Sequence, residues 1–155
     1  MLDRIDIHIE VPRVDYEKLS GDRVGESSES IRARVQAARN IQQARFTNPK
    51  SLFSNNGSAT DIVCNADMRV GEIRQFCKLP EDGQSLMRAA MTQLNLSARA
   101  YHRILKLART IADLAGCEEI QSAYIVDALH YRPKLMIGQA KILSQQHHSS
   151  PIASA

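Results

Sequence analysis

Tryptophan is absent from the 155 residues, and aromatic side chains make up only 5% of them. A core must therefore be built from Leu, Ile, Val, Ala and Met. That composition favours helices packed on helices over a sandwich of aromatic-rich strands. The length fits one domain better than two.

Cysteine is also scarce, with only Cys64, Cys77 and Cys117 in the chain. No two of them have CxxC spacing and no histidine stands beside them, so we predict no metal site. No apolar run is long enough to span a membrane, and the N-terminus lacks the pattern of a signal peptide. We therefore expect a cytoplasmic protein with reduced thiols and no membrane partner. The net charge of +3 does not by itself indicate nucleic acid.

Residues 5–11 read IDIHIEV, a strict alternation of apolar and polar side chains that Pro12 interrupts. Period two over seven residues predicts a strand. No second run of this quality follows, and a single strand cannot satisfy its own backbone. We therefore expect one orphan N-terminal strand whose sheet lies outside this sequence, which indicates a fragment of a longer protein.

The remainder of the chain predicts helices. Capping residues and apolar periodicity place them at about 28–45, 70–77, 80–94, 97–116 and 121–131, with a further turn or two at 135–143. Residues 47–65 form a long polar loop, and the tail after Pro133 is expected to fray. The predicted fold class is mainly α.

The predicted helix 98–116 has one apolar arc and one cationic arc. Arg99, Arg103, Lys106 and Arg109 share the cationic arc with His102, Thr110 and a single acid, Asp113. Arg99 and Arg103 are like charges four residues apart, which costs a few tenths of a kcal/mol. The arc is either a solvated basic face, a partner of a distant acidic segment, or a phosphate site. Arg99 suits phosphate because it lies in the first helical turn.

A second cationic helix carries four arginines and no acid among them: Arg32, Arg34, Arg39 and Arg45. These arginines could contact the phosphates of a nucleic acid without reading its sequence. Two alternatives remain equally open. The helix is an ordinary solvated one, or its arginines pair with acids of a missing core.

Three segments resemble the C-terminal portion of magnesium-chelatase-like AAA+ ATPases, closest to the competence-associated bacterial group. They are MLDRIDIHIEVPRVDYEKL from Met1, SARAYHRILKLARTIADLAG from Ser97 and IVDALHYR from Ile125. The resemblance implies a C-terminal lid helical bundle with the orphan strand and a helical insertion. It divides the chain into the last strand of a truncated AAA+ core (1–12), the insertion and polar loop (13–66), the lid (67–132) and a partly disordered tail (133–155).

The resemblance also implies roles for individual arginines. Arg4, in the DRID segment, corresponds to the arginine finger that reaches a neighbouring subunit's nucleotide. Arg99, in the SAR segment, corresponds to the sensor-2 arginine, with Arg103 beside it at the nucleotide. The sequence lacks both the P-loop pattern GxxxxGK[ST] and an acidic Walker B strand. ATP and Mg²⁺ are therefore expected only in the full-length protein, with no cofactor and no activity in this fragment.

The function implied for the parent protein is ATP-driven work in a ring, expected to be a hexamer. Its partners would be the upstream AAA+ core, identical subunits and DNA, as in a helicase-like motor of competence or recombination. One alternative is the ATPase subunit of a magnesium chelatase. Another, for the fragment itself, is a non-enzymatic helical interaction module. Salt-dependent DNA binding would favour the first, and co-purification with a large porphyrin-binding subunit the second.

Overall fold

The computed structural model describes residues 5–13, 25–47 and 62–132. Five α-helices and one 3-10 turn lie within these ranges: α2 (Ser28–Thr47), η2 (Asn65–Asp67), α3 (Val70–Phe76), α4 (Glu81–Gln93), α5 (Ala98–Leu114) and α6 (Ser122–His130). The mainly helical prediction is confirmed, and each of these helices matches a predicted one to within a few residues. The predicted turns at 135–143, the tail and most of the polar loop lie outside the described residues.

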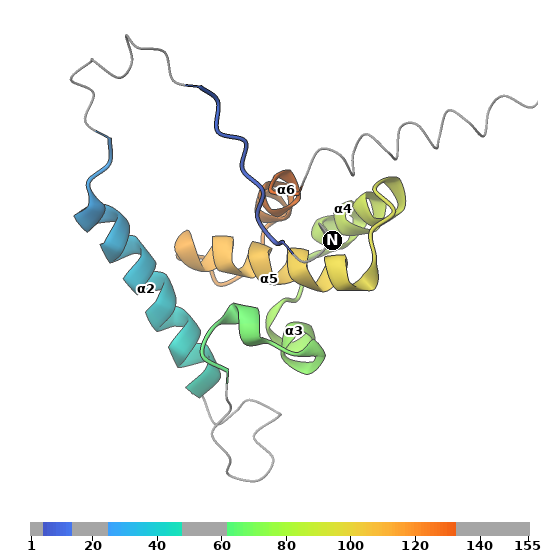
Figure 1. The fold of residues 1–155 in the computed structure, drawn as a ribbon. Coiled ribbons are helices and arrows are strands. Elements are labelled where there is room, and N and C mark those ends of the chain that lie inside the picture. Colours follow the sequence, from blue (N-terminus) through green and yellow to red (C-terminus); the bar gives the residue numbers. More distant parts are fainter. Residues whose placement is uncertain (1–4, 14–24, 48–61, 133–155) are drawn as a thin grey trace, which may run out of the picture.

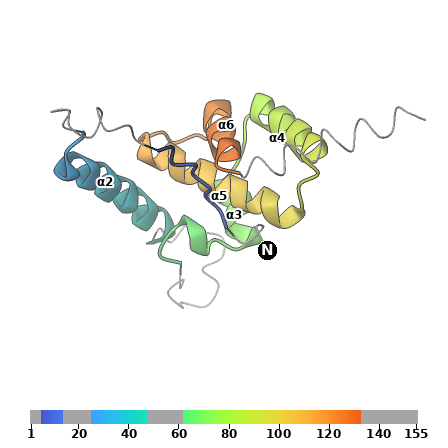
Figure 2. The ribbon, with the colours of Figure 1, turned by 45° about the horizontal axis from the view of Figure 1, so that its top comes forward.

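Helix α5 lies at the centre of the described structure (Figure 1). It contacts α6, α2, η2 and α3, and α4 packs in turn against α6. Helix α2 runs beside the C-terminal end of α5, whereas α4 and α6 lie together on another side, as the rotated view in Figure 2 also shows. The predicted boundaries between strand, insertion, lid and tail stay a prediction, although α2 packs directly on the predicted lid.

The ends of α5 are set by Ser97 and Gly116. The Ser97 hydroxyl accepts a hydrogen bond from the Ala100 amide at 3.2 Å, which caps the first turn. At the other end Gly116 adopts a φ of +68°, a left-handed conformation that glycine takes without steric cost. Its amide donates to the Asp113 carbonyl at 3.1 Å, so the helix stops there.

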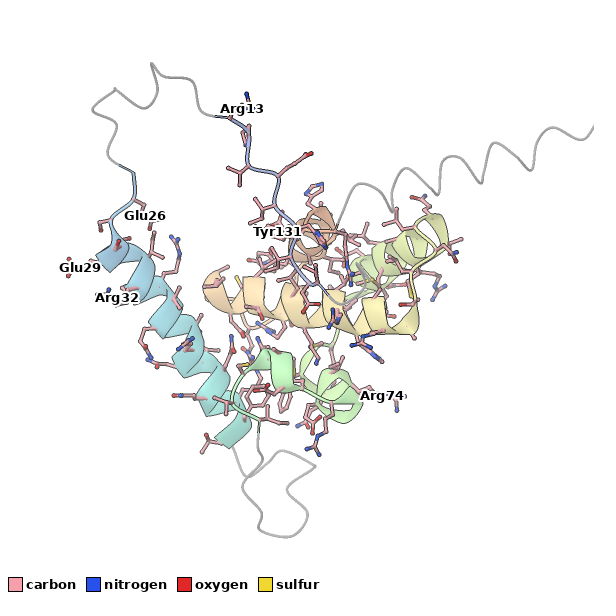
Figure 3. The ribbon with its side chains drawn as sticks, in the orientation of Figure 1. Arg13, Glu26, Glu29, Arg32, Arg74 and Tyr131 are labelled. Atoms are coloured by element: carbon pink, nitrogen blue, oxygen red, sulfur yellow. The ribbon has the colours of Figure 1, made fainter. Side chains whose placement is uncertain are left out.

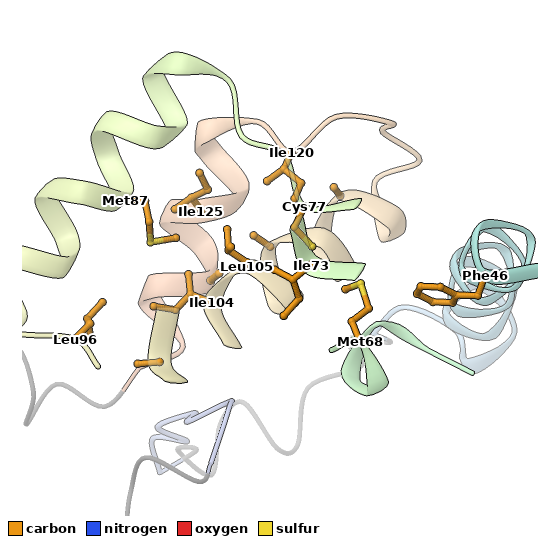
Figure 4. Close-up of a cluster of buried hydrophobic side chains, with 14 residues drawn as sticks. Phe46, Met68, Ile73, Cys77, Met87, Leu96, Ile104, Leu105, Ile120 and Ile125 are labelled. Atoms are coloured by element: carbon orange, nitrogen blue, oxygen red, sulfur yellow. The ribbon is translucent and has the colours of Figure 1, made fainter. Parts of the chain in front are cut away.

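The core is an aliphatic cluster around the predicted apolar arc of α5 (Figure 4). Ile104 and Ala108 are almost completely buried, and so are Met87, Ile120 and Ile125 from α4 and the α6 region. Small residues along α5, including Ala100, Ala108 and Ala112, let neighbouring helices approach closely. The scarcity of aromatics thus leads to a tight helix bundle, as the composition predicted.

The predicted strand is wrong for this chain, because no residue of the described ranges lies in a strand. Residues 5–13 instead pass over α5 beside α6, and the His8 amide donates to the Tyr131 carbonyl at 2.8 Å. A strand needs a neighbouring backbone to pair with, and no other described segment supplies one. The alternating apolar side chains therefore stay exposed, from 48% at Ile7 to 82% at Val11.

Cys77, the residue directly after α3, provides a probe of this core. It is 5% exposed, and burial raises the pKa of its thiol from 9.0 to about 12. The thiol is therefore protonated and inert at neutral pH. Because the folded pKa exceeds the unfolded one, the stability that the neutral thiol contributes is complete below pH 9 and is lost as the pH rises toward 12.

We expect iodoacetamide at mildly alkaline pH to alkylate the partly exposed Cys64 and Cys117 well before Cys77. Adding urea should bring the rate at Cys77 to that of the other two, since unfolding exposes the thiol. Peptide mapping by mass spectrometry measures all three rates in one sample. Equal rates without denaturant would show that the core around Cys77 is open.

Candidate functional site

Arg99 stands in the first turn of α5, directly after the capping Ser97. Its side chain is exposed and makes no hydrogen bond or ion pair with any other described residue. The start of a helix carries unsatisfied backbone amides and the positive end of the macrodipole, and both attract anions. The structure thus places an uncommitted guanidinium where phosphate oxygens are favoured.

Arg103, one turn further along α5, is committed to the N-terminal segment. Its guanidinium lies 3.1 Å from the Asp6 carboxylate, and the arginine side chain is 21% exposed. Together with the bond between the His8 amide and Tyr131, this ion pair holds residues 5–13 against α5 and α6. Segments far apart in sequence therefore meet close to Arg99. Arg4 itself lies outside the described residues.

A buried carboxylate at the last turn of α5 joins that helix to α2. Asp113 has no exposed side-chain surface, and both of its oxygens accept from Arg45 of α2, one of them at 2.9 Å. Arg109 donates from Nε to the same carboxylate at 3.0 Å and is itself 3% exposed. One acid thus lies between two arginines in a water-poor environment.

The remaining donors of this cluster are also satisfied. Arg109 donates to the carbonyls of Cys117 and Glu118, which orders the connection from α5 to α6. The Asn65 amide group donates to Asp113 at 2.8 Å and to Thr110 at 3.1 Å. We name Arg45, Asn65, Arg109, Thr110 and Asp113 the arginine–aspartate cluster. It ties α2, η2 and the end of α5 together.

The cluster changes how two of the predicted faces are understood. Arg109 and Asp113 do not belong to a solvated or anion-facing arc, because the helix beside them buries both. Arg45 lies in the same cluster and turns toward Asp113, so its guanidinium already has a carboxylate partner inside the fold. The sequence carried one signal for this arrangement, the four-residue spacing of Arg109 and Asp113. Nothing in the sequence indicated that Arg45 would complete it.

The other arginines of α2 differ from Arg45. Arg34 is exposed and forms a two-point contact with Glu26, at 3.0 and 3.2 Å. Arg32 and Arg39 are exposed and make no hydrogen bond or ion pair with any other described residue. The four arginines that the sequence grouped together thus occupy three different environments.

A hollow of about 560 Å³ opens between α3, α4 and α5. Its lining includes the apolar residues Met91 and Leu105 and the cations Arg74, Lys78 and Arg88. Tyr101 and His102 of α5, two and three residues after Arg99, also line it.

Within the described ranges, no three His, Cys, Asp or Glu side chains come together as a metal ion requires. The same residues include no helix long and apolar enough to cross a membrane.

Comparison with known proteins identifies similar sequences. Residues 25–132 match the family described as magnesium chelatase, subunit ChlI C-terminal. The chain is 39% identical over 140 residues to competence protein ComM of Haemophilus influenzae, an alignment covering 89% of this chain and 24% of that protein. It is 36% identical over 146 residues to the uncharacterized protein YifB of Escherichia coli, covering 92% and 26% respectively. The chain therefore spans about a quarter of the length of these relatives.

Replacing Asp113 with Asn should destabilise the fold severely, because it leaves the buried Arg109 and the partly buried Arg45 without a counter-charge. Breaking a buried ion pair from one side costs about 3–5 kcal/mol. Asp127→Asn is the matched control, since Asp127 is exposed on α6 and should change the free energy of unfolding by less than about 0.5 kcal/mol. Urea unfolding followed by circular dichroism measures both. A loss below about 1 kcal/mol for Asp113→Asn would contradict the structural role of the cluster.

Proposed function

Because this chain belongs to the magnesium chelatase subunit ChlI C-terminal family, we propose that it is the sensor and lid portion of a ring-forming AAA+ ATPase. In this proposal the parent protein is a DNA-remodelling, helicase-like motor. The nucleotide-binding P-loop and the Walker B acid lie in another part of the parent protein, since this sequence has neither. The observation that carries the proposal is the exposed, uncommitted Arg99 at the first turn of the central helix.

Arg99 is proposed as the sensor-2 arginine. Hydrolysis of ATP is catalysed mainly by positioning and by stabilising charge on the transferring phosphoryl group. An arginine suits that task because its planar fork matches phosphate oxygens. The α5 position supports the assignment, because the helix core is rigidly packed whereas the guanidinium stays unpaired within the described residues. Mg²⁺ and the β-phosphate would be held by the upstream core.

Arg4 is proposed as an arginine finger for a neighbouring subunit. Support comes from the segment that follows it, which the Asp6–Arg103 ion pair holds on the side of α5 next to Arg99. Arg103 therefore acts in this proposal by positioning the N-terminal segment, with its own charge balanced by Asp6. The described part of this segment, from residue 5 onward, thus lies on the same side of α5 as Arg99.

The proposal that the motor acts on DNA is based on a similar protein and not on the geometry around Arg99. The similar protein of Haemophilus influenzae is named a competence protein, and competence involves the uptake and handling of DNA. The second candidate, an ATPase subunit of a magnesium chelatase, draws on the family description. Purification of the full-length protein separates the two. DNA-stimulated ATP hydrolysis favours the motor, and association with a large porphyrin-binding subunit favours the chelatase.

Arg99→Ala in the full-length protein should lower ATP turnover by about 100-fold or more, as removal of a charge that stabilises the transition state does elsewhere. The fold should be unchanged, because an exposed side chain leaves no cavity when it is shortened. Turnover measured without DNA, together with ring assembly by size-exclusion chromatography, tests this. Arg32→Ala is the matched control, an exposed arginine early in α2. Unchanged turnover of assembled Arg99→Ala rings would refute the sensor role.

Arg4→Ala should abolish hydrolysis in a way that mixing can rescue. Rings that combine Arg4→Ala subunits with subunits disabled in their P-loop contain some interfaces with an intact finger and an intact nucleotide site. An arginine supplied in trans accelerates phosphoryl transfer by about three to five orders of magnitude, so mixed rings should recover activity that neither parent shows. If co-assembled rings stay inactive, Arg4 serves its own subunit or only the fold.

A further inference from the structure

Helix α2 is attached to the bundle by its second half only. Its buried residues are Ala38, Gln42 and Phe46, and Arg45 enters the arginine–aspartate cluster from the same half. Every residue from 28 to 37 is exposed. Figure 1 shows this half of α2 extending beyond the end of α5. About ten residues of regular helix therefore project from the bundle, and their side chains are accessible to a binding partner.

Beyond its first turn, the only charged side chains that α2 carries are positive. After Glu29 no acidic residue occurs up to Thr47, while four arginines do. Two of these four arginines form ion pairs: Arg34 pairs with Glu26 and Arg45 pairs with Asp113. The other two, Arg32 and Arg39, have no partner among the described residues.

These two arginines lie on one stripe of the helix. Seven residues separate them, which is close to two turns and about 10.5 Å along the axis. Gln36 and Gln43 fall on the same stripe and are exposed as well, so the stripe reads Arg, Gln, Arg, Gln. Figure 3 shows Arg32 on the side of α2 that points away from the rest of the molecule.

We propose that the stripe Arg32, Gln36, Arg39 and Gln43 binds the phosphate backbone of DNA. Arginine offers a fork that matches phosphate oxygens, and glutamine amides donate hydrogen bonds to the same groups. The stripe has no aromatic residue for stacking on bases. The contact would therefore be insensitive to sequence. This inference rests on the proposed function in one respect, namely that the parent protein acts on DNA.

The composition of the stripe favours a polyanion over a protein partner. Protein interfaces usually centre on buried aromatic or aliphatic anchors. Here the exposed aliphatic residues Ile31 and Val35 continue the buried face of α2, about a quarter of a turn away from the stripe. The stripe itself is wholly polar and cationic. A regularly spaced array of phosphates satisfies two unpaired arginines without any apolar contact.

The test compares two double variants of the full 155-residue chain. Arg32→Gln with Arg39→Gln removes the unpaired charges of the stripe. Arg74→Gln with Arg88→Gln removes two exposed arginines from α3 and α4, so both variants lose the same net charge. Circular dichroism checks that each keeps its helix content. Binding to a fluorescein-labelled oligonucleotide of mixed sequence, single-stranded or annealed to its complement, is followed by fluorescence anisotropy between about 50 and 200 mM salt.

The stripe variant should bind more weakly and with a shallower salt dependence. Each phosphate contact contributes about 0.9 to the slope of log K against log salt for a duplex and about 0.7 for a single strand. Losing two contacts should therefore reduce the slope by about 1.8 or 1.4. The control pair should keep the slope of the original chain. Comparison of the two oligonucleotides shows which form of DNA the stripe prefers.

Three results would overturn the inference. Equal weakening by both double variants would mean that overall charge, not the stripe, attracts DNA. If the unaltered chain does not bind the oligonucleotide at the lowest salt concentration, the stripe is not a DNA-binding surface. If the stripe variant binds DNA as the unaltered chain does but assembles differently, the stripe contacts an acidic surface of another subunit and not DNA.

The same variants in the full-length protein separate this inference from the proposed function. If the ring still binds DNA with its original salt slope when Arg32 and Arg39 are glutamine, the stripe is not a DNA contact, and the motor proposal stands. If the unaltered ring neither binds DNA nor hydrolyses ATP faster in its presence, the motor proposal fails as well.

Discussion

The carboxylate of Asp113, buried between two arginines, is the interaction on which the arrangement of the described helices depends. It draws Arg45 from α2 and Arg109 from its own helix, and Arg109 in turn orders the turn that leads into α6. A buried ion pair of this kind is costly to desolvate and gains its value from complete hydrogen bonding. That condition is met here, because Asn65 donates to the same carboxylate and Thr110 accepts from Asn65. The cluster fixes the register of α2 on α5, which apolar contacts through Phe46 and Ala38 alone would specify loosely.

The cluster also relates the two candidate functional regions. Arg99 stands at the first turn of α5 and Asp113 at its last, so the helix separates them by about 21 Å. Because α2 is fixed at the Asp113 end, α5 connects the proposed nucleotide contact at one end with the projecting half of α2 at the other. If ATP hydrolysis shifts the lid through Arg99, a rigid α5 carries the stripe of Arg32 and Arg39 with it. The ion pair between Arg103 and Asp6 attaches the N-terminal segment to the same helix, so three elements of the proposed motor share one support.

Local signals in the sequence were sufficient for the helices. Ser97 caps α5, Gly116 ends it in the left-handed conformation, and Pro80 directly precedes α4. The apolar arc of α5 was predicted correctly because period 3.6 reports which side of a helix is buried. The strand prediction was wrong for a different reason. Alternating apolar and polar residues indicate that a segment is suited to a sheet, but a strand forms only beside another strand, and the described residues contain none. The arginine–aspartate cluster could not be predicted because periodicity marks Arg109 and Asp113 as polar without revealing that α2 covers them.

An arginine is a candidate anion-binding residue only if no carboxylate of the chain already pairs with it, and the residue type alone does not show this. Arg45 and Arg109 share Asp113, Arg34 has Glu26, and Arg103 has Asp6. Each of these guanidinium groups already contacts a carboxylate of the chain, so a phosphate would have to compete with that carboxylate. Arg99, Arg32 and Arg39 face no such competition among the described residues, and an incoming anion gains their full electrostatic attraction. The sequence grouped all seven as cations on helix faces. Three acids, Asp6, Glu26 and Asp113, account for four of the seven. The three that are left are Arg99 at the start of α5 and Arg32 and Arg39 on α2.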